Sequence, residues 1–248
     1  MKIVISSGHG KYIRGASGYL DEVDEARRVV ERVAQLLRML EVGVTTFHDD
    51  TSTSQSQNLD TIVAFHNDQN RDLDVSVHFN AYETTSSPMG TEVLYVTQEE
   101  LASNLSGDLA DALRLPNRGG KYRSDLAFLN GTDEPAILIE TCFVDSSSDA
   151  DAYHARFEAA CVAIAQTLSG QEITDRPPVP PELPERPPLT EENRVDITGQ
   201  VHGDVAVLIN GQPVMGRERC VNAVVLTIAM TGDVVVTING QDFHSEES

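Results

Sequence analysis

The chain has no tryptophan, and aromatic residues make up only 5% of its 248 positions. Its three cysteines, Cys142, Cys161 and Cys220, lack the short CxxC spacing that is typical of zinc ribbons and redox sites. We therefore expect neither a disulfide framework nor a cysteine-based metal site. A run of about 18 apolar residues, which a membrane-spanning helix needs, is also missing, so we expect no membrane insertion.

Basic residues are scarce as well. The chain has 18 lysines and arginines against 39 aspartates and glutamates, which gives a net charge of −21. Proteins that bind nucleic acid need a basic surface to meet the phosphates, so nucleic acid is not an expected partner. The acidic residues are spread along the chain, which is typical of a solvated surface that favours solubility.

A secretion signal is not apparent either. The first residues, MKIVISSGHG, contain an apolar stretch that is too short for a signal core, and no small-residue cleavage site follows it. We therefore expect synthesis in the cytoplasm without a signal peptide.

Proline is concentrated in one place, because residues 176–188 hold seven of the eleven prolines. Such a stretch favours an extended polyproline conformation and acts as a semi-rigid spacer. It predicts a first domain over residues 1–170, a linker over 171–194 and a C-terminal domain over 195–248.

In the first domain, short strands rich in valine and isoleucine alternate with helical patterns. The expected strands are residues 2–6, 43–48, 75–79, 91–96 and 136–141. The expected helices, with apolar residues three and four apart, are residues 22–40, 55–69, 98–113 and 147–168. This alternation predicts an α/β fold with a mainly parallel sheet sandwiched by helices, in which sites gather at the carboxyl ends of strands.

Three of these strands end in residues that bind metals or transfer protons. His9 follows the first strand between two glycines, which permit a sharp turn; His78 and Glu140 lie near the ends of two later strands. Glu22 opens the first helix close to the centre of its apolar stripe, where a carboxylate needs a positive partner. Two histidines and one carboxylate are a common ligand set for catalytic zinc, and a second carboxylate can serve as general base and acid.

Each of these residues also has an ordinary structural explanation. His9 could be a turn residue, His78 a hydrogen-bonded core histidine and Glu22 a favourable carboxylate at a helix N-terminus. Glu140 is harder to explain in this way, because an isolated buried carboxylate is costly. Asn80 could orient substrate or His78, or simply form a turn.

Two further histidines, His48 and His66, are expected to be structural. His66 extends the apolar stripe of the second helix, which indicates a packed core or rim residue.

Three segments carry a family resemblance: IVISSGHGKYIRGASGYLDEVDEA, VSVHFNA and PAILIETCFVD. In order and spacing they resemble the signature segments of the zinc-dependent N-acetylmuramoyl-L-alanine amidases of the Amidase_3 family. The resemblance covers roughly residues 1–170 and implies a phosphorylase/hydrolase-like fold. It also implies that His9, Glu22 and His78 bind one Zn²⁺ and that Glu140 is the catalytic acid and base.

The chain departs from the family pattern at two positions. Ser7 stands where the family usually has proline before Gly-His-Gly, which alters the turn but not the ligand. Cys142 replaces the glycine that usually follows the late glutamate, so the packing behind Glu140 is expected to differ.

The resemblance implies a peptidoglycan hydrolase that cleaves the amide between N-acetylmuramic acid and L-alanine of the stem peptide by zinc-activated water. Bacterial peptidoglycan is then the expected partner. A zinc peptidase acting within the stem peptide, and a non-catalytic peptidoglycan-binding protein on the same scaffold, are alternatives. The retained Glu140 argues against the pure binder, which does not need a buried base.

The setting also follows from the resemblance. A wall amidase without a signal peptide, followed by a proline-rich linker and a small module, resembles a phage endolysin, which reaches the wall when the membrane is breached. A bacterial autolysin exported by a non-classical route is the alternative.

The last part of the chain contains an internal repeat. GDVAVLINGQP (203–213) and GDVVVTINGQD (232–242) each form a strand pattern ending in Asn-Gly, a strong hairpin signal, and residues 223–230 form another strand pattern. These patterns predict a small all-β domain. Wall binding and homo-oligomerisation are two functional interpretations, and a purely structural hairpin repeat is the third.

Overall fold

The computed structural model describes residues 1–173 and, beyond them, the backbone of six strands. These strands are β7 (Arg194–Gln200), β8 (Gly203–Ile209), β9 (Gln212–Cys220), β10 (Ala223–Ala229), β11 (Val234–Ile238) and β12 (Gln241–His244). The chain divides into two compact units, Met1–Pro178 and Val179–Ser248, which we describe separately. Most of the expected linker, residues 174–193, lies outside the described residues.

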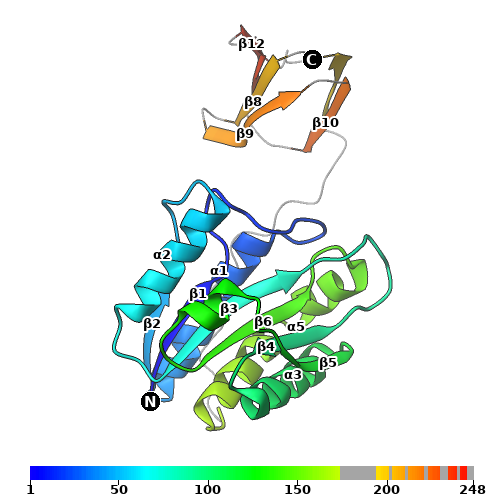
Figure 1. Cartoon of the computed structure of the whole chain (residues 1–248). Helices are drawn as coiled ribbons and strands as arrows, with labels where there is room; N and C mark the ends of the chain where they lie inside the picture. The colour runs from blue at the N-terminus through cyan, green and yellow to red at the C-terminus, as the bar shows by residue number, and fades with distance from the viewer. Residues whose placement is uncertain are drawn as a thin grey trace. The chain divides into compact units, whose positions relative to one another are not determined.

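The first unit is built on a six-stranded sheet with the order β2-β1-β3-β6-β4-β5 (Figure 1). Its strands are β1 (Lys2–Ser7), β2 (Gly43–Phe47), β3 (Leu73–Asn80), β4 (Thr91–Tyr95), β5 (Asn117–Tyr122) and β6 (Ala136–Phe143). All neighbouring strands are parallel except β4 and β6, which are antiparallel. The expected α/β fold with a mainly parallel sheet is therefore confirmed, and the sheet is mixed because β4 and β5 run against the other four strands.

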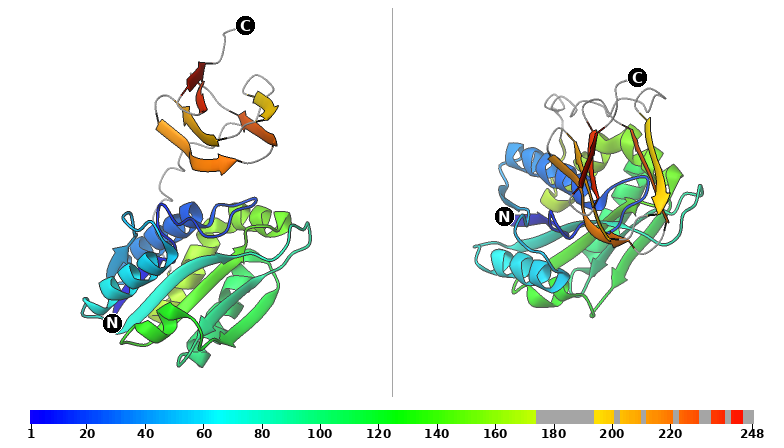
Figure 2. Two further views of the ribbon diagram at one scale, coloured as in Figure 1. Left: turned by 45° about the horizontal axis from the view of Figure 1, so that its top comes forward. Right: turned by 90° about the horizontal axis from the view of Figure 1, so that it is seen from above.

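Five helices cover the two faces of this sheet: α1 (Glu22–Met39), α2 (Gln55–Asn67), α3 (Glu99–Leu113), α4 (Ala127–Gly131) and α5 (Ser147–Ser169). The larger apolar cluster joins α1, α3 and α5 to one face, and the smaller cluster joins α2 and α4 to the other. Figure 2 shows α1 and α2 on opposite sides of the sheet. Within the described residues, no helix is long and apolar enough to cross a membrane.

Strand alternation decides which side chains face each helix layer. On β3, Val77 and Phe79 enter the larger cluster, so the intervening His78 points to the α2 and α4 side. On β6, Ile139 enters the larger cluster and Glu140 points the other way. His78 and Glu140 are both only partly buried, so α2 and α4 leave the carboxyl ends of β3 and β6 accessible.

Two elements of this unit were absent from the sequence-based prediction. The strand β5 has the sequence NRGGKY, which contains no branched apolar residue and has two glycines. The helix α4 has only five residues, too few to display a helical period. Both elements exist because neighbouring parts of the sheet and α2 support them.

The second unit contains only antiparallel pairings among its described strands. One sheet has the order β12-β11-β8-β9, and β10 pairs with β7. The strands β8 and β11 come from the two copies of the repeat, and each pairs with the strand that follows its Asn-Gly. The two copies also pair with each other, with Val207 opposite the equivalent Val236. The domain boundaries and the role of this unit stay predictions.

Candidate metal centre and active site

The structure brings His9, Glu22 and His78 together at one end of the sheet. Glu22 Oε1 lies 3.0 Å from His78 Nδ1 and 3.5 Å from His9 Nε2. The two imidazole rings meet edge to face with centroids 5.0 Å apart. One potential ligand atom from each residue lies within 4.8 Å of the others, a spacing that a single metal ion can bridge.

Glu22 owes its position to the beginning of α1. Asp21 caps the helix by accepting a hydrogen bond from the Asp24 N–H, and Arg14 pairs with the Asp21 carboxylate. Glu22 is then the first helical residue, only 3% exposed, and its Oε2 accepts a hydrogen bond of 2.7 Å from the Ala16 N–H. The inward carboxylate that the apolar stripe predicted is therefore present.

The charges of the three residues are coupled. Burial raises the pKa of Glu22, but the hydrogen bond and charge of His78, with the charge of His9 and the Ala16 N–H, together outweigh burial and hold that pKa below its usual value. Burial lowers the pKa of His78, but Glu22, with a contribution from Glu140, more than reverses this, so the pKa of His78 is raised. The pKa of His9 is lowered by burial and by the neighbouring His78, which favours the neutral ring that metal ligation requires.

Two glycines make room for these side chains. A Cβ on Gly8 would lie 1.7 Å from His78 Nε2, and a Cβ on Gly15 would lie 2.3 Å from Glu22 Oε2. Gly15 also has a φ of +68°, which favours glycine, whereas neither glycine that flanks His9 adopts a left-handed φ. The chain bends at Gly8 and His9, as expected, and Gly8 in addition allows the His78 ring to approach.

The donor set fits a zinc ion. Two imidazoles and one carboxylate are typical ligands of catalytic zinc. In addition, the buried His9 Nδ1 has no hydrogen-bond partner among the described residues. Buried polar nitrogens nearly always have a hydrogen-bond partner. An unpaired buried nitrogen is therefore expected where a side chain binds a metal ion.

Glu140 stands beside this centre, directly opposite His78 in the register of β3 and β6. Its Oε2 is buried and has no hydrogen-bond partner among the described residues. Burial raises the pKa of Glu140 to about 7, with Glu22 and Glu92 adding to the effect and His78 and Arg123 opposing it. A carboxyl group that titrates near neutrality can both accept and donate a proton, which suits a general base and acid.

A cavity of about 450 Å³ opens next to Glu140, His78 and His9. Its other walls are largely apolar and come from α2, from the α4 region and from the sheet, including Leu59, Ile62, Val63, Leu94, Leu126, Phe128 and Leu138. The cavity therefore brings a bound molecule against the two histidines and the carboxyl group at once.

Asn80, the remaining candidate, does not turn toward His78. Its Nδ2 donates a hydrogen bond of 3.2 Å to Glu92 Oε1, and its Oδ1 accepts one from the Ala81 N–H. In the structure Asn80 therefore orients Glu92 and not His78, and substrate contact stays a prediction.

His66 is structural, as predicted. It is fully buried, and its ring nitrogens lie 2.7 Å from Asp74 Oδ1 and 2.9 Å from Ser6 Oγ. Arg71 donates to both oxygens of the same aspartate.

His48 is also held by structural contacts. It lies between Ser7 Oγ and Glu31 Oε1, at 3.0 Å and 3.2 Å. The Ser7 hydroxyl in addition donates to the His9 carbonyl, so the residue that replaces the usual proline ties the His9 turn to His48. The other departure, Cys142, is fully buried in the larger apolar cluster.

Sequence reasoning missed Glu92, which lies opposite Glu140 in the register of β4 and β6 and is 6% exposed. Its signal was available, because a glutamate inside the apolar segment TEVLYV calls for the same explanation as the glutamate in AILIET. Arg118 and Lys121, which bind Glu92, were not predictable because their strand was not recognised.

Comparison with known proteins now identifies the family. The family described as N-acetylmuramoyl-L-alanine amidase, Amidase_3, matches residues 3–169. The chain belongs to this family. The match spans the whole sheet and all four site residues of this amidase-family chain.

The chain is also similar to other proteins of known sequence. A 38.4 kDa protein of Clostridium perfringens is 34% identical over 161 residues, covering 62% of this chain and 46% of that protein. The protein YqiI of Bacillus subtilis is 32% identical over 156 residues, covering 60% of this chain and 73% of that protein. The chain thus spans about half the length of the first of these relatives.

Solved structures share the amidase fold. The catalytic domain of the CD27L endolysin targeting Clostridia difficile superposes with a TM-score of 0.64 at 24% identity, covering 70% of this chain and 99% of that domain. The catalytic domain of CwlV, an N-acetylmuramoyl-L-alanine amidase from Bacillus (Paenibacillus) polymyxa, gives a TM-score of 0.57 at 22% identity, covering 68% and 96%. At these identities the likeness establishes the fold of the first unit.

Proposed function

We propose that the chain is a zinc-dependent N-acetylmuramoyl-L-alanine amidase, which hydrolyses the amide between N-acetylmuramic acid and the L-alanine of the stem peptide. The observation that carries this proposal is the placement of Glu140 directly opposite His78, beside His9 and Glu22, within a chain of the amidase family. Bacterial peptidoglycan is the corresponding substrate.

His9, Glu22 and His78 would hold the zinc ion. When bound, the ion polarises the amide carbonyl and makes a neighbouring water more acidic. Two of the three protein ligands are already oriented by hydrogen bonds: Glu22 by backbone N–H groups of Ala16 and Phe79, and His78 by Glu22.

Glu140 would perform the proton transfers. Its carboxylate accepts a proton from the attacking water and then donates that proton to the leaving amine nitrogen of L-alanine. Because burial raises the pKa of Glu140 to about 7, neither transfer is strongly uphill near neutral pH. The apolar walls of the adjoining cavity limit competing water around the reacting groups.

As for its biological setting, we propose a phage endolysin that is made in the cytoplasm and acts on the cell wall after release. The resemblance of the catalytic unit to an endolysin domain supports this setting, and a non-classically exported autolysin is the alternative. The C-terminal unit would then bind the wall or join copies of the chain.

The test is hydrolysis of muropeptides with defined stems, with products identified by mass spectrometry. We expect release of free stem peptides that begin with L-alanine, lost on chelation and in Glu140→Gln. The matched control is Glu100→Gln, which changes an exposed glutamate on α3 and should retain full activity.

Two other results would contradict the proposal. Cleavage inside the stem peptide would make the chain a peptidase. Stoichiometric zinc with no cleavage of any muropeptide would make it a binding protein on the amidase scaffold.

A further inference from the structure

A row of charged side chains crosses the sheet, starting from the candidate metal centre. His78 on β3 is opposite Glu140 on β6, and Glu140 is opposite Glu92 on β4. All three point to the face that α2 and α4 cover only in part. The row thus leads from the reacting groups toward the edge strand β5.

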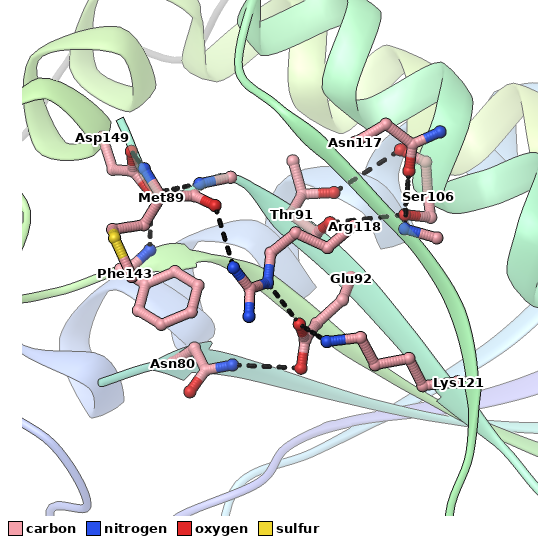
Figure 3. A network of polar contacts seen from close by, with 12 residues as sticks. Asn80, Met89, Thr91, Glu92, Ser106, Asn117, Arg118, Lys121, Phe143 and Asp149 are labelled. Atoms are coloured by element: carbon pink, nitrogen blue, oxygen red, sulfur yellow. Dashed lines mark hydrogen bonds and ion pairs between the residues drawn. The ribbon is translucent and has the colours of Figure 1, made fainter. Parts of the chain in front are cut away.

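On β5 the row continues as a pair of cations, Arg118 and Lys121. Residues three apart in a regular strand point to opposite faces, yet both of these side chains reach Glu92 Oε2 (Figure 3). The reason is an irregularity in the pairing of β4 with β5, where Thr91 is opposite Asn117 but Val93 is opposite Gly120. Gly119, at that point, has a φ of +81°, so the extra residue brings Arg118 and Lys121 to one face.

One cation would suffice to neutralise Glu92. That carboxylate is 8% exposed and already receives a hydrogen bond from Asn80, whereas Arg118 and Lys121 keep 34% and 39% of their side-chain surface exposed. Glu92, Arg118 and Lys121 together therefore carry one positive charge in excess, on a chain with a net charge of −21. Arg123, just beyond β5, adds none because it is paired with Asp125.

The two cations are also held in place. Arg118 packs over the Phe143 ring at 4.9 Å and donates to the Met89 carbonyl, in addition to its bond of 2.6 Å with Glu92 (Figure 3). Lys121 has three N–H donors, and Glu92 is the one acceptor that the described residues offer them. A fixed guanidinium beside an ammonium with spare donors is a ready site for a carboxylate.

We propose that Arg118 and Lys121 bind a carboxylate of the stem peptide, the free α-carboxylate on the residue that follows L-alanine. This inference rests on the proposed amidase function. β5 lies two strand spacings, roughly 10 Å, from Glu140. An extended peptide advances about 3.3 Å per residue, so the second stem residue lies within reach of these long side chains. The pair would make this chain select stems that carry D-isoglutamate over stems in which that carboxylate is amidated.

The test compares two substrates that differ only in this group. N-acetylmuramoyl tetrapeptides with D-isoglutamate or D-isoglutamine at the second position have nearly the same shape but differ by one charge. For the unmodified full chain loaded with zinc, we expect kcat/KM to be about tenfold higher for the charged stem, mainly through KM. The preference should shrink as ionic strength rises.

Single substitutions identify the residues. In Lys121→Gln and in Arg118→Gln the ratio should fall to roughly threefold or less, while Glu92 keeps its other cation and remains paired. Arg38→Gln, which removes a charge from the far side of α1, should leave the ratio at its original value. Melting temperatures of all three variants show whether any loss is one of folding.

Equal kcat/KM for the two stems in the unmodified chain, or variants that lower both rates equally, would overturn the assignment. Absence of cleavage at the muramoyl–alanine amide in either substrate would instead overturn the proposed function, and this inference with it.

Discussion

Two clusters of histidine and carboxylate lie on the same side of the same sheet, and they differ in whether their polar atoms have partners. In the closed cluster, His66 contacts Asp74 and Ser6, and Arg71 donates hydrogen bonds to the Asp74 carboxylate. All these side chains are buried. In the open cluster at the candidate metal centre, His9 Nδ1 and Glu140 Oε2 are buried and find no hydrogen-bond partner in the part of the chain that the structure describes.

The contrast distinguishes a polar cluster that stabilises the fold from one that is available to a ligand. The closed cluster has the residue types of a Ser-His-Asp triad, but its serine is 0% exposed and every member is satisfied within the protein. The open cluster keeps donors and acceptors unpaired at the wall of a cavity, which costs stability and leaves atoms free for an ion and a substrate. Residue types alone do not distinguish the two clusters, whereas the partners of each atom do.

The largest effect is expected from breaking the closed cluster. Asp74→Asn leaves Arg71 buried without its counterion, so the free energy of unfolding should fall by about 3–5 kcal/mol. Urea unfolding measures this change. Zinc bound per folded molecule should not change, and a variant that stays stable but loses zinc would show that the two clusters are not independent.

In the open cluster, replacing the carboxylate of Glu140 with an amide should raise the free energy of unfolding instead of lowering it. The pKa of Glu140 is raised from 4.5 to about 7 in the folded chain, so folding favours its protonated form. That contribution is fully present below pH 4.5 and is lost as pH rises through 7. In chelator, Glu140→Gln should therefore raise the free energy of unfolding by up to about 3 kcal/mol at pH 8 and by little at pH 4.5.

Urea unfolding at the two pH values tests this. Equal effects of Glu140→Gln at pH 4.5 and pH 8 would mean that Glu140 is not protonated by burial. The activity of the same variant should be lost at both pH values.

A smaller effect is expected when the open cluster is crowded. Gly8→Ala places a methyl group on the His78 ring and should displace that ring from Glu22 and His9. Zinc affinity, measured by competition with a chromophoric chelator, should fall about 10–100-fold. Gly43→Ala is the matched control, since its added methyl group would meet the flexible Lys2 side chain at 3.3 Å and the backbone of Met1 and Lys2 at ordinary contact distances of 3.7 Å and 3.9 Å.

The smallest effect is expected at His48, which contacts the His9 turn through Ser7. Its partner Glu31 is 51% exposed, so His48→Gln should lower the free energy of unfolding by less than about 1 kcal/mol. Thermal melts measure the change. A large loss of zinc affinity in this variant would show that the Ser7–His48 contact orients His9.

Much of the open cluster could be predicted from the sequence, because its members lie where strands end and a helix begins. His9, His78 and Glu140 follow apolar strand patterns, and Glu22 follows from the helical stripe. The role of Gly8 could not be predicted, since it depends on a ring that is distant in sequence. The strand β5 escaped notice because NRGGKY is stabilised by its neighbours and not by its own composition.

The closed cluster was predicted only in part. The apolar stripe placed His66 in the core, but its contacts with Ser6 and Asp74 depend on strand order, which local patterns do not contain. The departure at Ser7 was visible, yet its link to His48 required the parallel pairing of β1 with β2.

The irregularity at Gly119 has a consequence for how the protein behaves at high concentration. β5 is the edge of the sheet, and an exposed edge strand is a template on which other chains can add strands and aggregate. A bulge and charged side chains on the edge strand, lysine above all, are devices that block such addition. Arg118, Gly119 and Lys121 supply both devices, so replacing them with a regular apolar strand would lower the solubility of the folded protein.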